Sequence, residues 1–294
     1  MQPMHREMPT VWLLGDVAHR EFAEAVSLIR TTSRATCIED VGRAAELVAG
    51  APVAPELFVL AASRTGVIAT PEIERLRRAA PLAGVVALLG SWCEGESRSG
   101  RPAAGVGRVY WYDFPNWWRR QMSAWAAGCC PEWARAEDFG LPAPAGKLLA
   151  DCDFARAGSS STPAGLVALE TTCYETAAAL TDVLRFAGFA TAGSTSGSKT
   201  PPIRGASVGI WEGRQLDNRE LPRLAAFCAK LAVDHAPVVA LADFPRRDRV
   251  ELSLQAGAAA VLGKPWRNAD LIATLHQAMD NRDQTTAVRV ARAA

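Results

Sequence analysis

Residues 237–279 have the sequence PVVALADFPRRDRVELSLQAGAAAVLGKPWRNADLIATLHQAM. The apolar run at 237–242 predicts a buried strand, and the apolar spacing of 247–256 predicts a helix after it. A short strand follows at 260–262 and a helix at 269–279. Because parallel strands are joined by crossover helices, this order of elements predicts an α/β fold.

The same alternation of strand and helix runs through the rest of the chain and occurs twice. Upstream of residue 237, the second half contains the strand candidates 165–170, 189–193 and 207–211 and the helix candidates 174–186 and 221–233. The first half contains the strand candidates 10–16, 35–38, 56–62, 84–89 and 109–112 and the helix candidates 19–30, 41–48, 71–80 and 116–127. The shared order indicates an internal structural repeat.

We therefore predict two doubly wound parallel-sheet domains of the flavodoxin-like type in tandem, at 9–128 and 164–282. The segment 129–163 between them is rich in Pro, Gly, Ala and Ser, which is typical of a linker. The residues 283–294 are polar and contain Arg, and we expect a frayed tail there.

Composition excludes several classes of protein. The 32 basic and 31 acidic side chains leave a net charge of +1, so there is no general electrostatic attraction to nucleic acid. No apolar run reaches the roughly 18 residues of a membrane span, and the polar N-terminus does not resemble a secretory signal. Seven cysteines without a C-x-x-C pair favour reduced thiols over zinc or disulfides. We expect a cytoplasmic protein that binds neither nucleic acid nor membrane.

The segment 237–279 resembles the C-terminal half of response-regulator receiver domains. Ala256, Gly257 and Ala258, followed by the Lys264–Pro265 dipeptide, match the family pattern in order and spacing. The resemblance implies an aspartate after the third strand that accepts a phosphoryl group, and an acidic pair after the first strand that holds Mg²⁺. It also implies a hydroxyl after the fourth strand and a lysine after the fifth, both contacting the phosphoryl group.

Several of these positions are altered in the second half. The resemblance places the lysine at Lys264, the hydroxyl at Ala242 and the phospho-acceptor at Glu212. The acidic pair falls on Glu170 and Thr171. The pocket therefore keeps its lysine and one acid, but loses the hydroxyl and has an acceptor one methylene longer. A carboxylate displaced by about 1.5 Å loses much of its reactivity.

Three roles remain open for Glu212. Its carboxylate could stand permanently near Lys264 and imitate a phosphorylated state. Alternatively, Glu212 and Lys264 could both be solvated at the sheet edge. Lys264 would then donate a hydrogen bond to a carboxylate, because a partly buried lysine needs an acceptor. In the third case the domain takes phosphate despite its losses, and only then is Mg²⁺ needed; we otherwise expect no cofactor or metal.

The first half keeps less of the pattern. Asp16 fits an acid after the first strand, but the acceptor position falls on Ala61 and the hydroxyl position on Leu89. The lysine position falls on Trp111 or Tyr112. An alanine cannot accept a phosphoryl group, so the first domain is predicted to be a receiver-like shell without the chemistry.

Tryptophan is concentrated between residues 92 and 133, which hold six of the nine. Trp118, Met122 and Trp125 share one helical face by their spacing, and this stripe could pack on its own sheet. The alternative is contact with a protein partner or a second copy, because aromatic side chains anchor interfaces. The residues assigned to that contact are Trp111, Tyr112, Trp117, Trp118 and Trp125.

Two loops bear on other functions. Glycines and Pro102 in 90–107 predict a loop in place of a fourth helix, with Cys93 and Glu94 as titratable groups and Trp92 tying it down. An enzyme or small-molecule binder could use this loop, although no His is near Cys93 in sequence. The motif GSTSGSKT at 193–200 differs from a phosphate-binding loop only at Ser198, but Pro201–Pro202 follows where a helix must begin. We expect a flexible loop there.

The sequence thus predicts a non-catalytic receiver-like protein of two-component or phosphorelay-type signal transduction. It would act through protein contacts and would not be phosphorylated in the usual way. Arginine greatly outnumbers lysine, a bias typical of GC-rich bacterial genomes.

Overall fold

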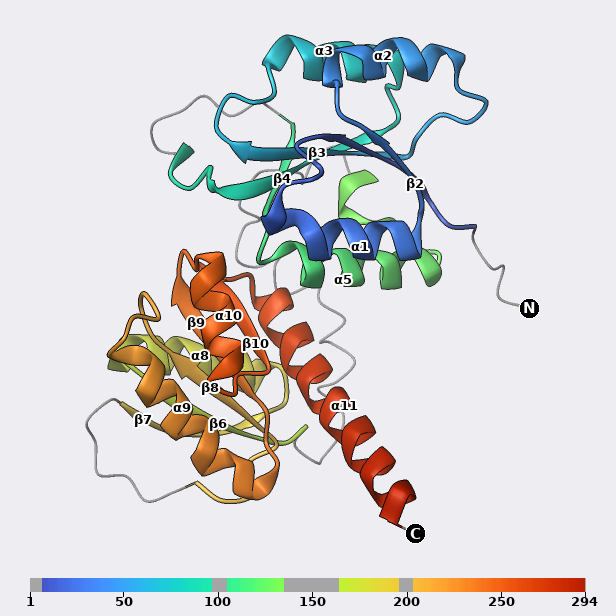
Figure 1. Cartoon of the computed structure of the whole chain (residues 1–294). Coiled ribbons are helices and arrows are strands. Elements are labelled where there is room, and N and C mark those ends of the chain that lie inside the picture. The colour runs from blue at the N-terminus through green and yellow to red at the C-terminus, as the bar shows by residue number, and fades with distance from the viewer. Residues whose placement is uncertain (1–6, 97–104, 135–163, 196–202, 294) are drawn as a thin grey trace. The chain divides into compact units, whose positions relative to one another are not determined.

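The structure is a computed structural model that describes residues 7–96, 105–134, 164–195 and 203–293. The chain divides into two compact units, Met1–Ala143 and Pro144–Ala294, called here the N-terminal and C-terminal units (Figure 1). The division falls inside the expected linker 129–163, most of which lies outside the described residues.

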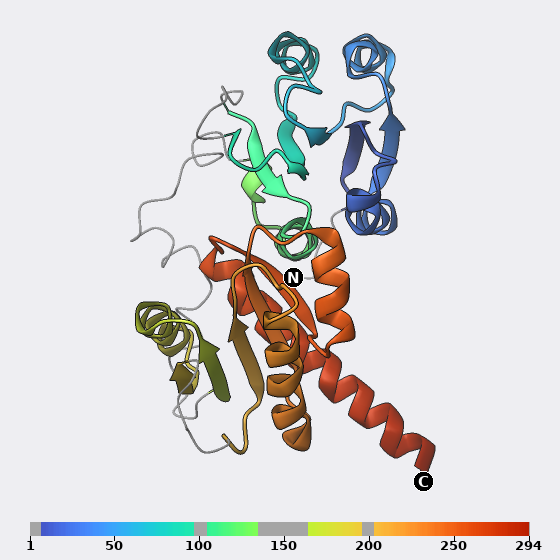
Figure 2. The same ribbon diagram turned by 60° about the vertical axis from the view of Figure 1, so that its left-hand side comes forward.

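The N-terminal unit contains a five-stranded parallel sheet. Its strands are β1 (Thr10–Gly15), β2 (Arg34–Ile38), β3 (Leu57–Arg64), β4 (Gly84–Trp92) and β5 (Gly107–Tyr110), in the spatial order β2-β1-β3-β4-β5. The helices are α1 (Ala23–Thr32), α2 (Val41–Gly50), α3 (Thr70–Ala79) and α5 (Phe114–Ala126), with short 3-10 turns η1 (Arg20–Phe22) and η2 (Glu132–Ala134). Figure 2 shows α2 and α3 end-on on one side of the sheet and α1 and α5 end-on on the other.

The C-terminal unit repeats this topology. Its strands are β6 (Leu166–Thr171), β7 (Ala190–Thr195), β8 (Val208–Glu212), β9 (Val238–Asp243) and β10 (Ala260–Lys264), in the order β10-β9-β8-β6-β7. The helices are α8 (Tyr174–Phe186), α9 (Glu220–Leu231), α10 (Arg247–Gln255) and α11 (Asn268–Ala293), and η3 (Ala232–Asp234) follows α9. In both units the second strand lies at an edge, beside the first, and the third, fourth and fifth follow in turn.

Burial on both faces of each sheet explains the continuous apolar runs of the strands. Leu13 packs in the core beneath α1 and α5, whereas its neighbour Leu14 packs in the core beneath α2 and α3. In the C-terminal unit, Leu241 and Ala242 divide in the same way between the α8–α11 core and the α9–α10 core. The predicted fold class of two doubly wound parallel-sheet domains in tandem is confirmed.

The structure differs from the expectations at four element boundaries. The helix expected at 269–279 continues as α11 to Ala293, so the backbone of the expected tail is helical. Residues 280–293 contain neither Gly nor Pro, and nothing in their sequence ends a helix. Strand β4 extends to Trp92 and β5 begins at Gly107, which takes both ends of the expected 90–107 loop into the sheet. Strand β7 likewise reaches Thr195. The remainders of these two loops, 97–104 and 196–202, lie outside the described residues.

No helix within the described ranges has the length and apolar character needed to cross a membrane.

Candidate functional site

The carboxyl ends of four strands in the C-terminal unit bring the candidate receiver pocket together. Glu212 ends β8, Asp243 ends β9 and Lys264 ends β10, while Thr172 follows β6 directly. The parallel register sets Lys264 opposite Asp243, so strand pairing alone brings these two side chains to one place. This edge is where open parallel sheets bind their ligands.

Glu212 is the central side chain of the cluster and is only 3% exposed. Its Oε1 lies 2.5 Å from Lys264 Nζ. Its Oε2 accepts hydrogen bonds from the backbone N–H of Thr172, at 2.7 Å, and from the Thr172 hydroxyl, at 2.5 Å. Both carboxylate oxygens are therefore already bound by groups of this chain.

The protonation state of Glu212 follows from these contacts. Burial by itself raises the pKa of the carboxyl group, but the hydrogen bonds from Lys264 and Thr172 and the charge of Lys264 outweigh burial. The net result is a pKa below the ordinary value of 4.5. Glu212 is therefore an anion at neutral pH, held by donors that favour its charged form.

Lys264 contacts a second carboxylate that the sequence analysis did not identify. Its Nζ lies 3.0 Å from Asp243 Oδ1, so one ammonium group bridges Asp243 and Glu212. Asp243 is more exposed than Glu212, and its Oδ2 is 4.0 Å from Arg214 Nε. The strand register is the signal that could have revealed Asp243, because it immediately follows the assigned position Ala242.

Among the other assigned pocket residues, Glu170, Ala242 and Pro265, only Glu170 carries an ionisable side chain. Ala242 is fully buried in the apolar core under α9 and α10. Pro265 is exposed, and its peptide bond with Lys264 is cis. Glu170 is partly buried, and Thr171 is fully buried with its hydroxyl donating to the Cys173 carbonyl at 3.1 Å.

The residues at this edge do not fit Mg²⁺. The ion requires several oxygen ligands in octahedral geometry. Both oxygens of Glu212 are taken by Lys264 and Thr172, and Thr171 stands where the second acid is required. In the described parts of the chain, no group of three or more His, Cys, Asp and Glu side chains is arranged to hold a metal ion.

The loop after Glu212 is held by a different carboxylate. Glu220, at the start of α9, accepts hydrogen bonds from the backbone N–H groups of Arg214, Gln215 and Leu216 at 2.7 to 2.9 Å. Leu216 adopts a left-handed conformation with φ of 53°. An internal anion therefore fixes the backbone beside the pocket.

At the corresponding edge of the N-terminal unit, the position assigned to the phospho-acceptor holds an alanine. Ala61 is fully buried at the acceptor position and Leu89 is buried at the hydroxyl position. The Asp16 carboxylate accepts a hydrogen bond from the Ser63 hydroxyl. At the lysine position, Trp111 donates its indole N–H to Ser91 Oγ at 3.0 Å, and Tyr112 is buried.

Most of the aromatic residues that were assigned to partner contact are core residues. They therefore do not form a contact surface for a partner. Trp117 and Trp118 are fully buried, and Trp125 and Tyr112 are nearly so. The tryptophans of α5 gather around Trp133 from η2, whose ring stacks on Trp118 at a centroid distance of 5.7 Å.

Each buried indole of α5 also has an internal acceptor. Trp117 donates to Glu132 Oε2, Trp118 to Thr32 Oγ1 and Trp125 to the Glu7 carbonyl, each at 2.8 Å. Buried and hydrogen-bonded rings cannot anchor a partner without unfolding their unit, so the assignment of Trp117, Trp118 and Trp125 to an interface was wrong. Trp111 is half-buried against the same core. Trp92, which was expected to tie down the 90–107 loop, is 76% exposed.

The loop between β4 and β5 does not present a reactive thiol. Cys93 is 1% exposed, and burial, with a smaller effect from Glu96, raises its pKa to about 11. A thiol with that pKa is protonated at neutral pH and is a poor nucleophile. Glu96 is paired with Arg108, and Glu94 is partly buried. Arg98 and Arg101 lie outside the described residues.

Comparison with known proteins adds little to this geometry. No protein-family model matches the chain, and no curated protein matches it. A signal receiver domain of a signal transduction histidine kinase from Syntrophus aciditrophicus is 18% identical over 40% of this chain and 92% of that domain, with a TM-score of 0.32. Full-length ShkA in complex with AMPPNP is 16% identical over 95% of this chain and 52% of its own, with a TM-score of 0.31.

A third solved structure, a putative sugar-binding protein from Salmonella typhimurium LT2, is 15% identical over 94% of this chain and 88% of its own. Its TM-score is 0.28. Likenesses of this size carry no argument about the site, which has to be judged on its own residues.

Proposed function

We propose that this chain is a signal-transduction protein built from two degenerate receiver-like modules. In this proposal it acts by protein contact, catalyses no reaction and accepts no phosphoryl group. The observation that carries the proposal is that both oxygens of Glu212 are bound by Lys264 and Thr172. The proposal also includes a bacterial, cytoplasmic setting, for which the arginine bias and the free cysteines are the support.

Phosphoryl transfer to a carboxylate requires a free oxygen lone pair and a cation that neutralises the incoming phosphoryl oxygens. At Glu212 three hydrogen-bond donors occupy three of the roughly four lone-pair sites of the carboxylate. The cation Lys264 already contacts two carboxylates. An incoming phosphoryl group would have to displace the donors of the Glu212 oxygen that it joins, which are Lys264 at Oε1 or Thr172 at Oε2. The geometry therefore favours a module fixed in one charge state.

Two exposed aromatic residues at the same sheet edge replace the buried tryptophans as candidate contacts. Tyr174 begins α8 and is 75% exposed, and Phe244 follows Asp243 and is partly exposed. Phe244 has a φ of 43°, a conformation that costs a bulky residue of the order of 1–3 kcal/mol and often marks functional positions. A partner docking here would lie directly over the Glu212–Lys264 pair.

The phosphorylation part is tested by titrating the full chain with Mg²⁺ and beryllofluoride, a phosphoryl mimic, while recording tryptophan fluorescence. Trp211 precedes Glu212 and is buried, so occupancy of the pocket should change its emission. The native protein should show no saturable response, and such a response would refute the proposal. A response in Glu212→Asp alone would show that Glu212 closes the pocket.

Two controls are needed to interpret the absence of a fluorescence response. A working receiver domain in the same buffer shows that the mimic has formed, and Trp211→Phe shows whether any signal comes from this residue. The contact part is tested with a photo-crosslinking residue at position 174 and a matched one at the exposed Lys230. Adducts of one defined mass should form only from position 174, and equal yields from both positions would contradict contact at this edge.

A further inference from the structure

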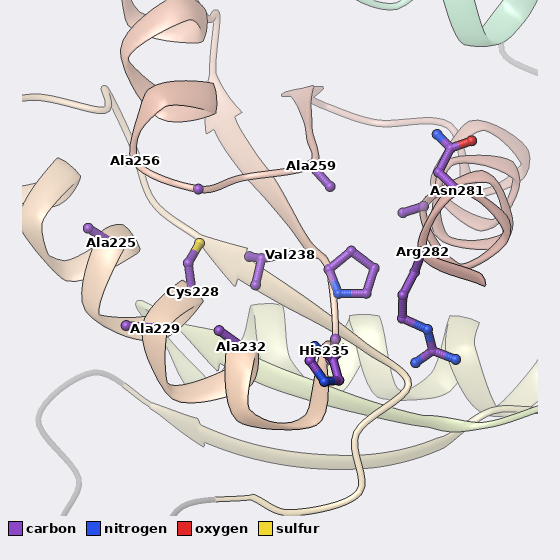
Figure 3. Close-up of a pocket in the computed structure, with 14 residues that line it drawn as sticks. Ala225, Cys228, Ala229, Ala232, His235, Val238, Ala256, Ala259, Asn281 and Arg282 are labelled. Atoms are coloured by element: carbon purple, nitrogen blue, oxygen red, sulfur yellow. The ribbon is translucent and has the colours of Figure 1, made fainter. Parts of the chain in front are cut away.

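A pocket of about 580 Å³ lies at the opposite end of the C-terminal unit's sheet, where the strands begin (Figure 3). Its walls come from α9 and η3, from the turns before β9 and β10, and from α11. Ala225, Cys228 and Ala229 lie on one side in Figure 3, and Asn281 and Arg282 lie on the other. No function discussed above uses this region.

The hollow exists because its walls carry small side chains. Ala225 and Ala229 are one helical turn apart on α9, and Ala256 and Ala259 flank Gly257 in the turn before β10. Gly257 has a φ of +104°, and a Cβ placed there would be 3.2 Å from Cys228 Cβ. The turn therefore approaches α9 closely, and it leaves an apolar surface that larger side chains would fill.

The polar side chains that line the pocket are His235, Asn281 and Arg282. Arg282 is partly buried, and its Nη1 donates to the Ser207 carbonyl at 3.3 Å, which holds the guanidinium against the sheet. His235 has a left-handed backbone with φ of 53°, stabilised by its N–H donating to the Ala232 carbonyl at 3.1 Å. None of the 14 lining residues is an Asp or Glu.

We propose that this pocket binds a small organic carboxylate with a compact apolar body. The carboxylate would lie at Arg282 and His235, since a guanidinium is the side chain best matched to a carboxylate. The apolar body would lie against the alanines of α9 and of the turn before β10. Apolar walls with a few polar groups that fix orientation are typical of ligand pockets, whose volumes run from about 300 to 1,000 Å³. This inference is independent of the proposed signalling function.

The probes are 4-methylpentanoate and phenylacetate, each compared with its neutral amide. Binding to the full chain is followed by calorimetry and by the amide signals of Cys228, Ala229 and Gly257 in ¹⁵N spectra. The acids should bind saturably, with a dissociation constant of about 1 mM or tighter, and should shift these signals. The amides should bind at least about tenfold more weakly, because they lack the charge.

Matched variants place the binding in the pocket. Ala229→Leu should abolish it by filling the hollow, whereas Ala226→Leu, on the exposed side of α9, should leave it unchanged. Arg282→Gln should weaken the acids about tenfold, and Arg185→Gln, an exposed arginine on α8, should not. The proposal is overturned if neither acid binds, if acids and amides bind equally, or if Ala226→Leu weakens binding as much as Ala229→Leu.

Discussion

Lys264 and Glu212 form an ion pair with 2.5 Å between Nζ and Oε1, at the carboxyl ends of β10 and β8. The pair is largely buried: the Lys264 side chain is 16% exposed. A buried ion pair adds little net free energy of folding, because the cost of removing both charges from water offsets their mutual attraction. Removing one partner is different, since it leaves the other charge buried and unpaired.

Lys264→Met should therefore destabilise the C-terminal unit strongly. We expect a loss of about 2–4 kcal/mol in the free energy of unfolding, somewhat below the range for fully buried pairs because Lys264 reaches solvent. Urea unfolding followed by circular dichroism measures it. Adding Glu212→Gln to Lys264→Met should recover much of the loss, and a double variant as unstable as the single one would show that the charge of Glu212 is not the cause.

The lowered pKa of Glu212 gives the pair a defined pH dependence. A carboxyl group whose folded pKa lies below its unfolded pKa contributes stability above the unfolded value, here 4.5, and loses it as pH falls through the folded value. The stability difference between the native protein and Glu212→Gln should thus shrink on acidification below 4.5. Unfolding curves from neutral pH downward test this, and a difference that grows toward acid would contradict the sign.

The tryptophan core predicts opposite results for two tryptophans of the same unit. Trp118→Ala removes a fully buried ring that stacks on Trp133, and should cost about 3–5 kcal/mol or prevent folding of the N-terminal unit. Trp92→Ala removes an exposed ring and should change stability by no more than about 0.5 kcal/mol. Thermal unfolding and near-ultraviolet circular dichroism distinguish them, and similar losses in both variants would contradict this packing.

The Glu220 carboxylate is expected to hold the loop beside the pocket. Glu220→Ala leaves three backbone N–H groups without their acceptor, which should cost about 1–3 kcal/mol. Glu251→Ala is the matched control, because Glu251 forms an exposed ion pair with Arg247, and its loss should cost less than about 1 kcal/mol. Hydrogen exchange of the Gln215 and Leu216 amides should accelerate in the first variant alone; unchanged exchange there would argue against this role.

Sequence alone was sufficient for the fold and for half of the site. The apolar runs revealed the strands because both faces of each sheet are buried. The resemblance to receiver domains assigned Lys264 and Glu212 to one pocket, and the structure brings these two side chains into contact. Asp243 escaped notice because its contact depends on the register of β9 and β10. The sequence left Trp118 between packing on its own sheet and contact with a partner, because its burial depends on Trp133, which lies outside the predicted helix.

The buried thiol of Cys93 and the partly buried thiol of Cys228 should react far more slowly than the exposed thiols. Burial raises the pKa of Cys93 and of Cys228 to about 11, so little thiolate exists at neutral pH. Cys37 and Cys173 are exposed and should be alkylated first by iodoacetamide, as mass spectrometry of digested protein would show. Between pH 7 and pH 9 the rate at Cys228 should rise about tenfold per pH unit, since the thiolate fraction rises so below the pKa. Reaction at Cys228 as fast as at Cys37 at pH 7 would contradict its burial against Gly257, and with it the close approach that forms the wall of the pocket.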